Sequence, residues 1–221
     1  MRRTSLMHTY STDNDNRTVV YGLLGVVAWF LIVWIGQATS LLASSIPALA
    51  GGTISWGVAF AGLSTVFSRI GWKTKIARVT GASKSPDFSG EWGGYIQTSY
   101  DGDIPESALH ESNDPAADMQ RVAASLHIEQ TWREISIHLS TDNSESDSTG
   151  ATVLTKDGRW PSLTYQYGNK PEADTEPSMA SHDGTADLSL KQNGTPDVLE
   201  GIYYTGPGRE NYGKMYFDRR E

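Results

Sequence analysis

The feature that most restricts the fold of this chain is a run of 51 residues, from Thr18 to Ser68, without any Asp, Glu, Lys, Arg or His. A helix needs about 20 apolar residues to cross a hydrocarbon core of about 30 Å. One crossing would leave half of the run unexplained, whereas two crossings fit. We therefore expect a membrane hairpin with helices over about 19–35 and 46–67, joined by a turn at 36–45.

The charges around this run predict its orientation. Lys and Arg cluster on both sides of it, at Arg2, Arg3, Arg17, Arg69, Lys73, Lys75, Arg78 and Lys84. Because such residues accumulate on the cytoplasmic side of membrane helices, we expect both ends of the hairpin in the cytoplasm. A cleaved signal peptide would have a shorter apolar region nearer the start, and a buried helix pair in a soluble protein would carry charges on its solvent face. Both alternatives fit the run less well.

The charge balance changes after the hairpin. Residues 1–84 hold 8 Lys and Arg against 2 Asp, whereas residues 85–221 hold 10 Lys and Arg against 24 Asp and Glu. An acidic domain of this kind is a poor partner for a nucleic-acid polymer, because binding to a phosphate backbone depends on excess Lys and Arg. The chain also has no Cys, which excludes disulfides, thiolate catalysis and Cys-based zinc sites.

We divide the chain into a polar N-terminal tail at 1–17, the hairpin at 18–68, a basic connector at 69–85 and a β domain at 86–221. In the β domain, apolar and polar residues alternate with period 2, which is the pattern of short strands. In the β domain, alternation and turn signals predict about eight strands, over 90–98, 126–132, 135–140, 151–155, 162–167, 182–192, 198–205 and 212–219. Residues 99–121 and 142–148 are expected to be polar loops, with a short helix near 116–124.

Antiparallel strands with one apolar face must hide their edges, and closure into a small barrel does so. An eight-stranded barrel is either filled by its side chains or holds one small ligand. The fold class expected is therefore a membrane-anchored, mainly β protein, with a two-helix hairpin followed by a small antiparallel barrel. A β-sandwich is the alternative architecture.

The sequence contains no clear pattern of a catalytic site. No pair of His residues has the spacing of a helical metal site, the string Ser181-His182-Asp183 is not a triad by adjacency alone, and no phosphate-binding glycine loop occurs. We expect no enzyme, no metal and no cofactor. By contrast, the strands are rich in Trp and Tyr, on which flat bases can stack, so a small-molecule pocket is a reasonable hypothesis. The alternative is that these aromatic residues only fill the core.

Several segments in order resemble a known family. After the hairpin come Pro86-Asp-Phe-Ser-Gly90-Glu-Trp92-Gly-Gly, Ile128-Glu-Gln130-Thr-Trp132, Ile135-Ser-Ile-His-Leu139, Leu163-Thr-Tyr165-Gln-Tyr167, His182-Asp-Gly184-Thr and Leu199-Glu-Gly201-Ile-Tyr203-Tyr204-Thr205. The order is similar to that of the two-transmembrane, β-strand-rich effectors of CBASS, the bacterial anti-phage systems built around cGAS/DncV-like nucleotidyltransferases (CD-NTases). The resemblance covers about 18–219.

The resemblance implies a lipocalin-like barrel in the cytoplasm, joined to a multi-pass hairpin of the cell inner membrane. The barrel would bind a cyclic dinucleotide made by a partner CD-NTase enzyme. Binding would drive homo-oligomerisation of the hairpins in the lipid bilayer and disrupt the membrane of the infected cell.

Ligand-binding positions also follow from the resemblance. The residues that match patterned positions of the family are Gln130, Trp132, Thr141, Ser144, Tyr165, Tyr167, His182 and Tyr203. The sequence departs from the family in a longer acidic segment at 99–121 and in having few cations in the barrel. Arg133, Arg209 and Arg219 are the candidates for contacts with phosphate.

Two other functions remain open at this stage. A constitutive membrane-anchored scaffold would bind a protein partner on the outside of a barrel with a filled interior. A carrier of an apolar ligand would have an interior without convergent Arg or Gln.

Overall fold

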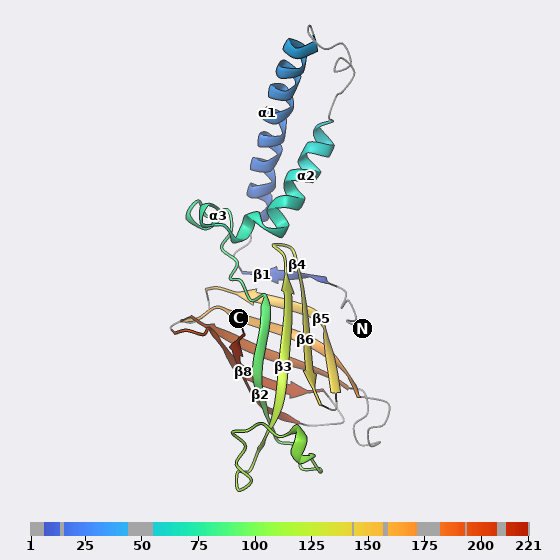
Figure 1. Cartoon of the computed structure of the whole chain (residues 1–221), viewed down its shortest axis with the longest axis vertical. Coiled ribbons are helices and arrows are strands. Elements are labelled where there is room, and N and C mark those ends of the chain that lie inside the picture. Colours follow the sequence, from blue (N-terminus) through green and yellow to red (C-terminus); the bar gives the residue numbers. More distant parts are fainter. Residues whose placement is uncertain are drawn as a thin grey trace. The chain divides into compact units, whose positions relative to one another are not determined.

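A computed structural model describes residues 7–13, 16–43, 55–142, 144–156, 159–171, 182–192, 194–206 and 211–220. The chain divides into two compact units, Asp15–Lys84 and the combination of Met1–Asn14 with Ser85–Glu221. The first unit is helical and the second is a β-barrel (Figure 1).

The helical unit contains a pair of packed helices, α1 (Arg17–Ala43) and α2 (Trp56–Arg69). Trp56 joins them: its indole N–H donates to the Gly25 carbonyl at 3.1 Å, and its ring stacks on Phe60. α1 includes part of the expected turn at 36–45, because its Gly, Gln, Ala, Thr and Ser residues continue the helix without a break. The segment that precedes α2 in the second expected helix, residues 46–54, lies outside the described residues.

Within the described residues, one stretch is long and apolar enough to cross a membrane, Arg17–Thr39 in α1. Its side chains are mostly exposed, and large apolar ones such as Leu23, Trp29 and Trp34 face outward. A short basic connector follows α2, formed by η2 (Gly71–Lys73) and α3 (Lys75–Val79).

The barrel is built from nine strands. They are β1 (His8–Thr12), β2 (Gly90–Thr98), β3 (Gln120–Gln130), β4 (Glu134–Thr141), β5 (Ser144–Leu154), β6 (Ser162–Pro171), β7 (His182–Lys191), β8 (Val198–Thr205) and β9 (Tyr212–Arg219). β2 to β9 form an antiparallel meander that closes where β2 pairs with β9. The expected barrel of about eight strands is thus confirmed, and a ninth strand comes from the N-terminal segment.

β1 lies within the polar N-terminal tail expected at 1–17, where no strand was expected. It pairs antiparallel with β4 at Thr9 and parallel with β5 from Tyr10. Only Tyr10 of this strand is buried, so the sequence carries one apolar residue where a strand pattern needs several. Its partner strands, more than 120 residues later, supply the rest of the pairing.

Two loop expectations were also wrong. Residues 144–148 form the start of β5, because Ser146 and Ser148 point inward and are buried although they are polar. The short helix expected near 116–124 is absent: β3 begins at Gln120, and the helical turn is η3 (Glu106–Ala108).

One end of the barrel, which we call the closed end, is filled with side chains. Fully buried residues gather there, among them Phe88, Trp92, Leu126, Ile128, Ile135, Leu163, Leu190, Leu199 and Phe217. The segment that leads into β2 lies across this end, because the Phe88 N–H donates to Oε1 of Gln130 at 2.8 Å and the Trp92 indole donates to the Phe88 carbonyl at 3.0 Å. Any space inside the barrel must therefore lie toward the other end.

Asp13 holds the end of β1. Its carboxylate accepts hydrogen bonds from the backbone N–H and the hydroxyl of Thr155 and from the N–H of Lys156, at 2.7–3.0 Å. Burial alone would raise the pKa of Asp13, but these hydrogen bonds outweigh it and hold the pKa below the ordinary value.

We predict that Asp13→Asn lowers the free energy of unfolding of the full chain by roughly 1 kcal/mol at pH 7. A group with a lowered pKa in the folded state stabilises above its unfolded pKa, and this contribution is lost as pH falls through the folded pKa. Urea unfolding in detergent should show a difference between the two proteins that shrinks below about pH 4. A difference that is independent of pH would contradict this role of the carboxylate.

Candidate ligand-binding site

The open end of the barrel contains a cavity of about 150 Å³. Its lining comes from β2 to β9, together with the connection between β2 and β3. The residues that line it are Ile96, Thr98, Tyr100, Ile104, Ala108, Val122, Leu139, Thr141, Ser144, Ser146, Tyr165, Tyr167, Asn169, His182, Tyr203, Thr205, Asn211 and Met215. Hydroxyl, amide and imidazole groups thus surround an apolar and aromatic interior.

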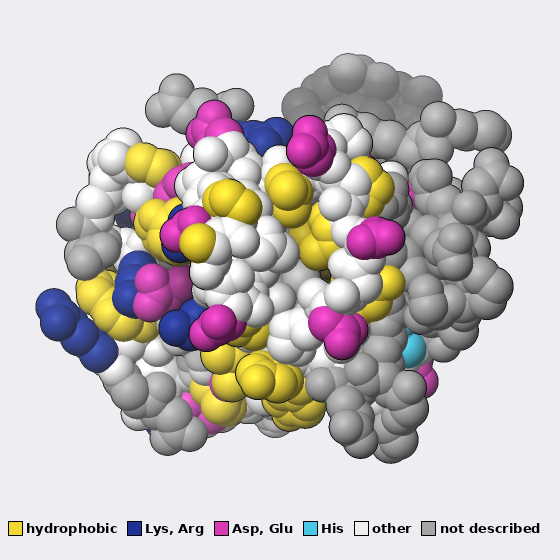
Figure 2. Space-filling view, turned by 90° about the horizontal axis from the view of Figure 1, so that it is seen from below, with side chains coloured by type: hydrophobic (Ala, Val, Ile, Leu, Met, Phe, Trp, Pro, Cys, Tyr) yellow, Lys and Arg dark blue, Asp and Glu magenta, His cyan; other side chains and the backbone are white. Residues whose placement is uncertain are grey.

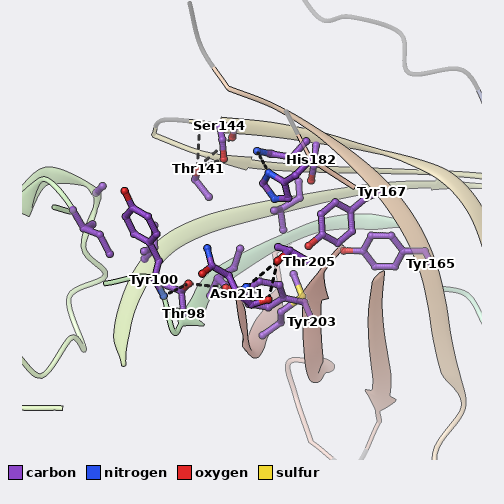
Figure 3. Close-up of a pocket in the computed structure, with 18 residues that line it drawn as sticks. Thr98, Tyr100, Thr141, Ser144, Tyr165, Tyr167, His182, Tyr203, Thr205 and Asn211 are labelled. Atoms are coloured by element: carbon purple, nitrogen blue, oxygen red, sulfur yellow. Dashed lines mark hydrogen bonds between the residues drawn. The ribbon is translucent and has the colours of Figure 1, made fainter. Parts of the chain in front are cut away.

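Four tyrosines belong to the lining, Tyr100 from the connection between β2 and β3 and three from the strands (Figure 3). Tyr165 and Tyr167 are buried on β6, with ring centroids 6.1 Å apart and ring planes tilted by 52°. Tyr203 approaches from β8, and its hydroxyl donates to Thr98 Oγ1 at 2.7 Å. Burial, with a smaller effect from Tyr167, raises the pKa of Tyr165 above its usual range, so its phenol stays neutral and can both donate and accept.

Gly184 makes room for one of these rings. A Cβ on Gly184 would lie within 2.4 Å of the Tyr167 ring and 2.8 Å of the Tyr204 carbonyl oxygen. Only glycine therefore allows Tyr167 to lie across β7. This explains the glycine in the motif His182-Asp-Gly184-Thr in terms of the shape of the cavity.

Polar groups face one another across the mouth. On one side lie Thr141, Ser144 and His182, and on the other lie Thr98 and Asn211 (Figure 3). Thr141 Oγ1 accepts from the Ser144 N–H at 3.1 Å, which fixes the β4–β5 turn. The mouth can therefore offer several hydroxyl and amide donors to one ligand.

The connection between β2 and β3 contributes residues that sequence reasoning missed. It was expected to be a surface loop, yet Tyr100, Ile104 and Ala108 line the cavity. The loop is attached to the barrel by an isolated bridge between Leu109 and Val122 and by a hydrogen bond from the His110 N–H to the Arg121 carbonyl at 2.8 Å. The apolar residues at 104, 108 and 109, within an otherwise acidic segment, were the available signal.

The structure brings together six of the eleven sequence-predicted site residues. Those that line the cavity are Thr141, Ser144, Tyr165, Tyr167, His182 and Tyr203. Gln130 and Trp132 lie at the closed end, where Gln130 binds the Phe88 N–H and the Pro86 carbonyl and Trp132 is buried. Neither of these two residues lines the cavity.

The three candidate arginines have different places. Arg219 belongs to the closed end: it donates to the carbonyls of Asp87 and Ser89, pairs with Asp197, and lies 4.3 Å from the centre of the Trp92 ring. Arg133 is exposed in the β3–β4 turn at the same end. Arg209 lies outside the described residues, although Thr205 and Asn211 on either side of that segment both line the cavity.

No Lys or Arg belongs to the described lining of the cavity. Across the described residues, no group of three or more His, Asp or Glu is arranged to hold a metal ion. Viewed from below in Figure 2, Asp and Glu side chains are scattered around apolar ones on this face of the molecule. An anionic ligand would therefore rely on neutral donors and on residues near the mouth.

Comparison with known proteins gives consistent matches. Residues 83–219 match the family model described as Cap15, cyclic dinucleotide receptor domain. A protein from Yersinia aleksiciae named CD-NTase-associated protein 15 is 39% identical over 100 residues, which cover 43% of this chain and 45% of that protein. A protein of the same name from Staphylococcus schleiferi is 27% identical over 154 residues, or 69% and 72% of the two chains. The chain thus matches less than half the length of the Yersinia protein.

We predict that Gln130→Ala destabilises the barrel, because it leaves the buried Phe88 N–H without its acceptor. The expected loss in the free energy of unfolding is about 1–3 kcal/mol. Gln166→Ala is the matched control, since that side chain is exposed on β6. Equal stability of both variants in chemical unfolding would show that Gln130 does not hold the closed end together.

Proposed function

Because the chain belongs to the family defined by the Cap15 cyclic dinucleotide receptor domain, we propose that its barrel binds a cyclic dinucleotide in the cavity at the open end. The observation that carries the proposal is the cavity itself, in which four tyrosines lie beside hydroxyl and amide donors. Bases stack on aromatic faces, and each stacked base contributes about 1–3 kcal/mol to binding.

The size of the cavity indicates which part of the ligand it can enclose. Pockets that enclose drug-sized ligands measure about 300–1,000 Å³. The cavity has about 150 Å³, so one base would fill it beside Tyr165 and Tyr167. The sugar and phosphate groups would then lie at the mouth, near Thr141, Ser144 and Asn211. Neutral donors can bind phosphate oxygens there without a resident cation.

The membrane part of the proposal rests on α1 and on the charge pattern. We expect a multi-pass hairpin of the bacterial inner membrane with both ends and the barrel in the cytoplasm. Ligand binding would favour an assembled state of the barrels by its higher affinity for that state. Because the membrane run carries no charges that could line a selective pore, assembly would disrupt the bilayer generally and act as anti-phage defence.

The carrier alternative has one observation in its favour: the described lining contains no Arg or Gln, as it predicts. The scaffold alternative predicts a filled interior and fits less well, since the open end is hollow. Binding assays with a panel of cyclic dinucleotides and with a fatty acid separate these functions. A fatty acid that binds while every cyclic dinucleotide fails would favour the carrier.

We predict that Tyr203→Ala lowers cyclic dinucleotide affinity by at least tenfold, which corresponds to about 1.4 kcal/mol of lost stacking. Tyr204→Ala is the matched control, because Tyr204 is the next residue on β8 and its side chain is 52% exposed on the outside. Calorimetry on the full chain in detergent, with cyclic di-AMP and cyclic di-GMP among the ligands, measures both variants. Equal losses would argue against the cavity as the site.

The arginines provide a second prediction. Arg209→Ala should weaken ligand binding and reduce its salt dependence, because Arg209 is the candidate cation whose neighbours along the chain line the mouth. Arg219→Ala should instead lower the melting temperature, since it removes hydrogen bonds at the closed end. Arg133→Ala should leave ligand affinity unchanged. Reduced affinity for Arg133→Ala with no effect of Arg209→Ala would reverse the assignment of the binding end.

A further inference from the structure

β1 fills a gap in the barrel wall. β4 and β5 pair directly over three residue pairs, all at the cavity end. Toward the closed end they separate, and β1 lies between them, antiparallel to β4 and parallel to β5. We call this position, formed by β4 and β5 around His8–Thr12, the β1 seam. Without β1, both seam strands would expose unpaired backbone groups, which bind an added strand readily.

The seam recognises its strand through side chains as well as backbone. Ser148 lies where the strands separate: its Oγ accepts from the Ile137 N–H at 2.9 Å and is 2.8 Å from His8 Nε2. Tyr10 is buried, and its hydroxyl donates to the Trp132 carbonyl at 3.1 Å. The seam is therefore built for this particular short strand.

No hairpin ties β1 to either neighbour. After β1 the chain runs through the helical unit and returns to the barrel at Ser85. The contacts of β1 in the seam would be the same if the strand came from a second copy of the chain. Exchange of a terminal element between identical chains is a low-cost route to assembly.

The linkers are long enough for such an exchange. Asn16, just before α1, donates to the carbonyls of Gly81 and Ala82, near the point where the chain returns to the barrel. The segments outside the paired strand, from Asp13 to Asn16 and from Gly81 to Ser85, span together about 25 Å when extended. Strands spaced 4.7–4.9 Å apart give a barrel of this size a backbone width of roughly 15–20 Å. A neighbouring barrel is thus within reach.

We propose that β1 exchanges between copies, so that the seam of one barrel takes β1 of a neighbouring copy. Each copy would then give its strand to one neighbour and take the strand of another. Head-to-tail contacts that do not close extend into clusters, and anchoring in a bilayer keeps the copies concentrated. The inference deepens the assembly step of the proposed function and rests on that step alone, not on the identity of the ligand.

Single-cysteine variants test the exchange directly, because the chain has no native Cys. Ser11 and Thr152 are register partners, and their hydroxyl oxygens are 2.8 Å apart. Cells would co-express Ser11→Cys with one tag and Thr152→Cys with another, and membranes would be oxidised with and without cyclic di-AMP. The control pairs Ser11→Cys with Lys214→Cys, an exposed position on β9 that is not part of the seam.

Exchange predicts a disulfide between the two differently tagged chains, several-fold above the control, in at least one of these conditions. A yield equal to the control in both conditions would overturn the proposal. An amine-reactive cross-linker, used in parallel, distinguishes the failure of strand exchange from the failure of assembly. Cross-linked oligomers without the disulfide would refute only the exchange, whereas monomers alone would refute the assembly step as well.

A variant in which β1 is held in its own seam gives a second test of the exchange. Ser11→Cys combined with Thr152→Cys in one chain should form an internal disulfide that holds β1 in its own seam. Oxidation should then reduce the yield of cross-linked oligomers several-fold, and a reductant should restore it. Oligomers that form equally well from the locked protein would overturn the proposal, since β1 could not have left its own barrel.

Discussion

The barrel depends on complete pairing of its strand edges. β2 and β9 close the meander directly, but β4 and β5 pair only from Asp147 toward the mouth and separate toward the closed end. A gap of this kind exposes two edges at once, and an exposed edge attracts other strands. β1 covers both edges, with Tyr10 filling the space beneath. Closure of the barrel thus depends on a segment that lies before α1 in sequence.

The two ends of the barrel interior differ in the side chains that point into them. At the closed end, large apolar residues fill the space, and Gln130 binds the backbone of the segment that crosses it. At the open end several inward positions hold tyrosine, serine or threonine. Two pairs of their hydroxyl groups lie within hydrogen-bond distance, Tyr203 with Thr98 and Thr141 with Ser144. Polar side chains thus take the places that large apolar side chains take at the closed end.

The strands from Gly90 onward could be predicted because their alternation is strong. Leu126 and Ile128 point inward, whereas His127 and Glu129 point outward, as expected. β1 and the start of β5 could not be predicted in this way, since their inward residues are a single tyrosine and two serines. Their partners are supplied by the tertiary structure, which overrides local pattern.

The candidate site was predictable in kind but not in place. Alternation of apolar and polar residues along a strand identifies the inward side chains, yet it does not say at which end of a barrel they lie. Gln130 and Tyr165 look alike in this respect, and only the register of the strands assigns one to the filled end and the other to the cavity. Arg219 shows the same difficulty for cations, because its role is decided by the carbonyls and the Trp92 ring that surround it.

β4 and β5 connect these two regions of the barrel. At the mouth they supply Thr141 and Ser144, which line the cavity, and at the closed end the same strands hold β1. The Tyr10 hydroxyl lies 3.0 Å from Ser85 Oγ, so the segments by which the chain leaves and re-enters the barrel meet at that end. A ligand that changes the spacing of β4 and β5 at the mouth would therefore act on the strand that precedes α1. Such coupling requires that the ligand bind more tightly to a seam that holds the β1 of a neighbour than to one that holds its own, and the equilibrium shifts by no more than this difference in affinity.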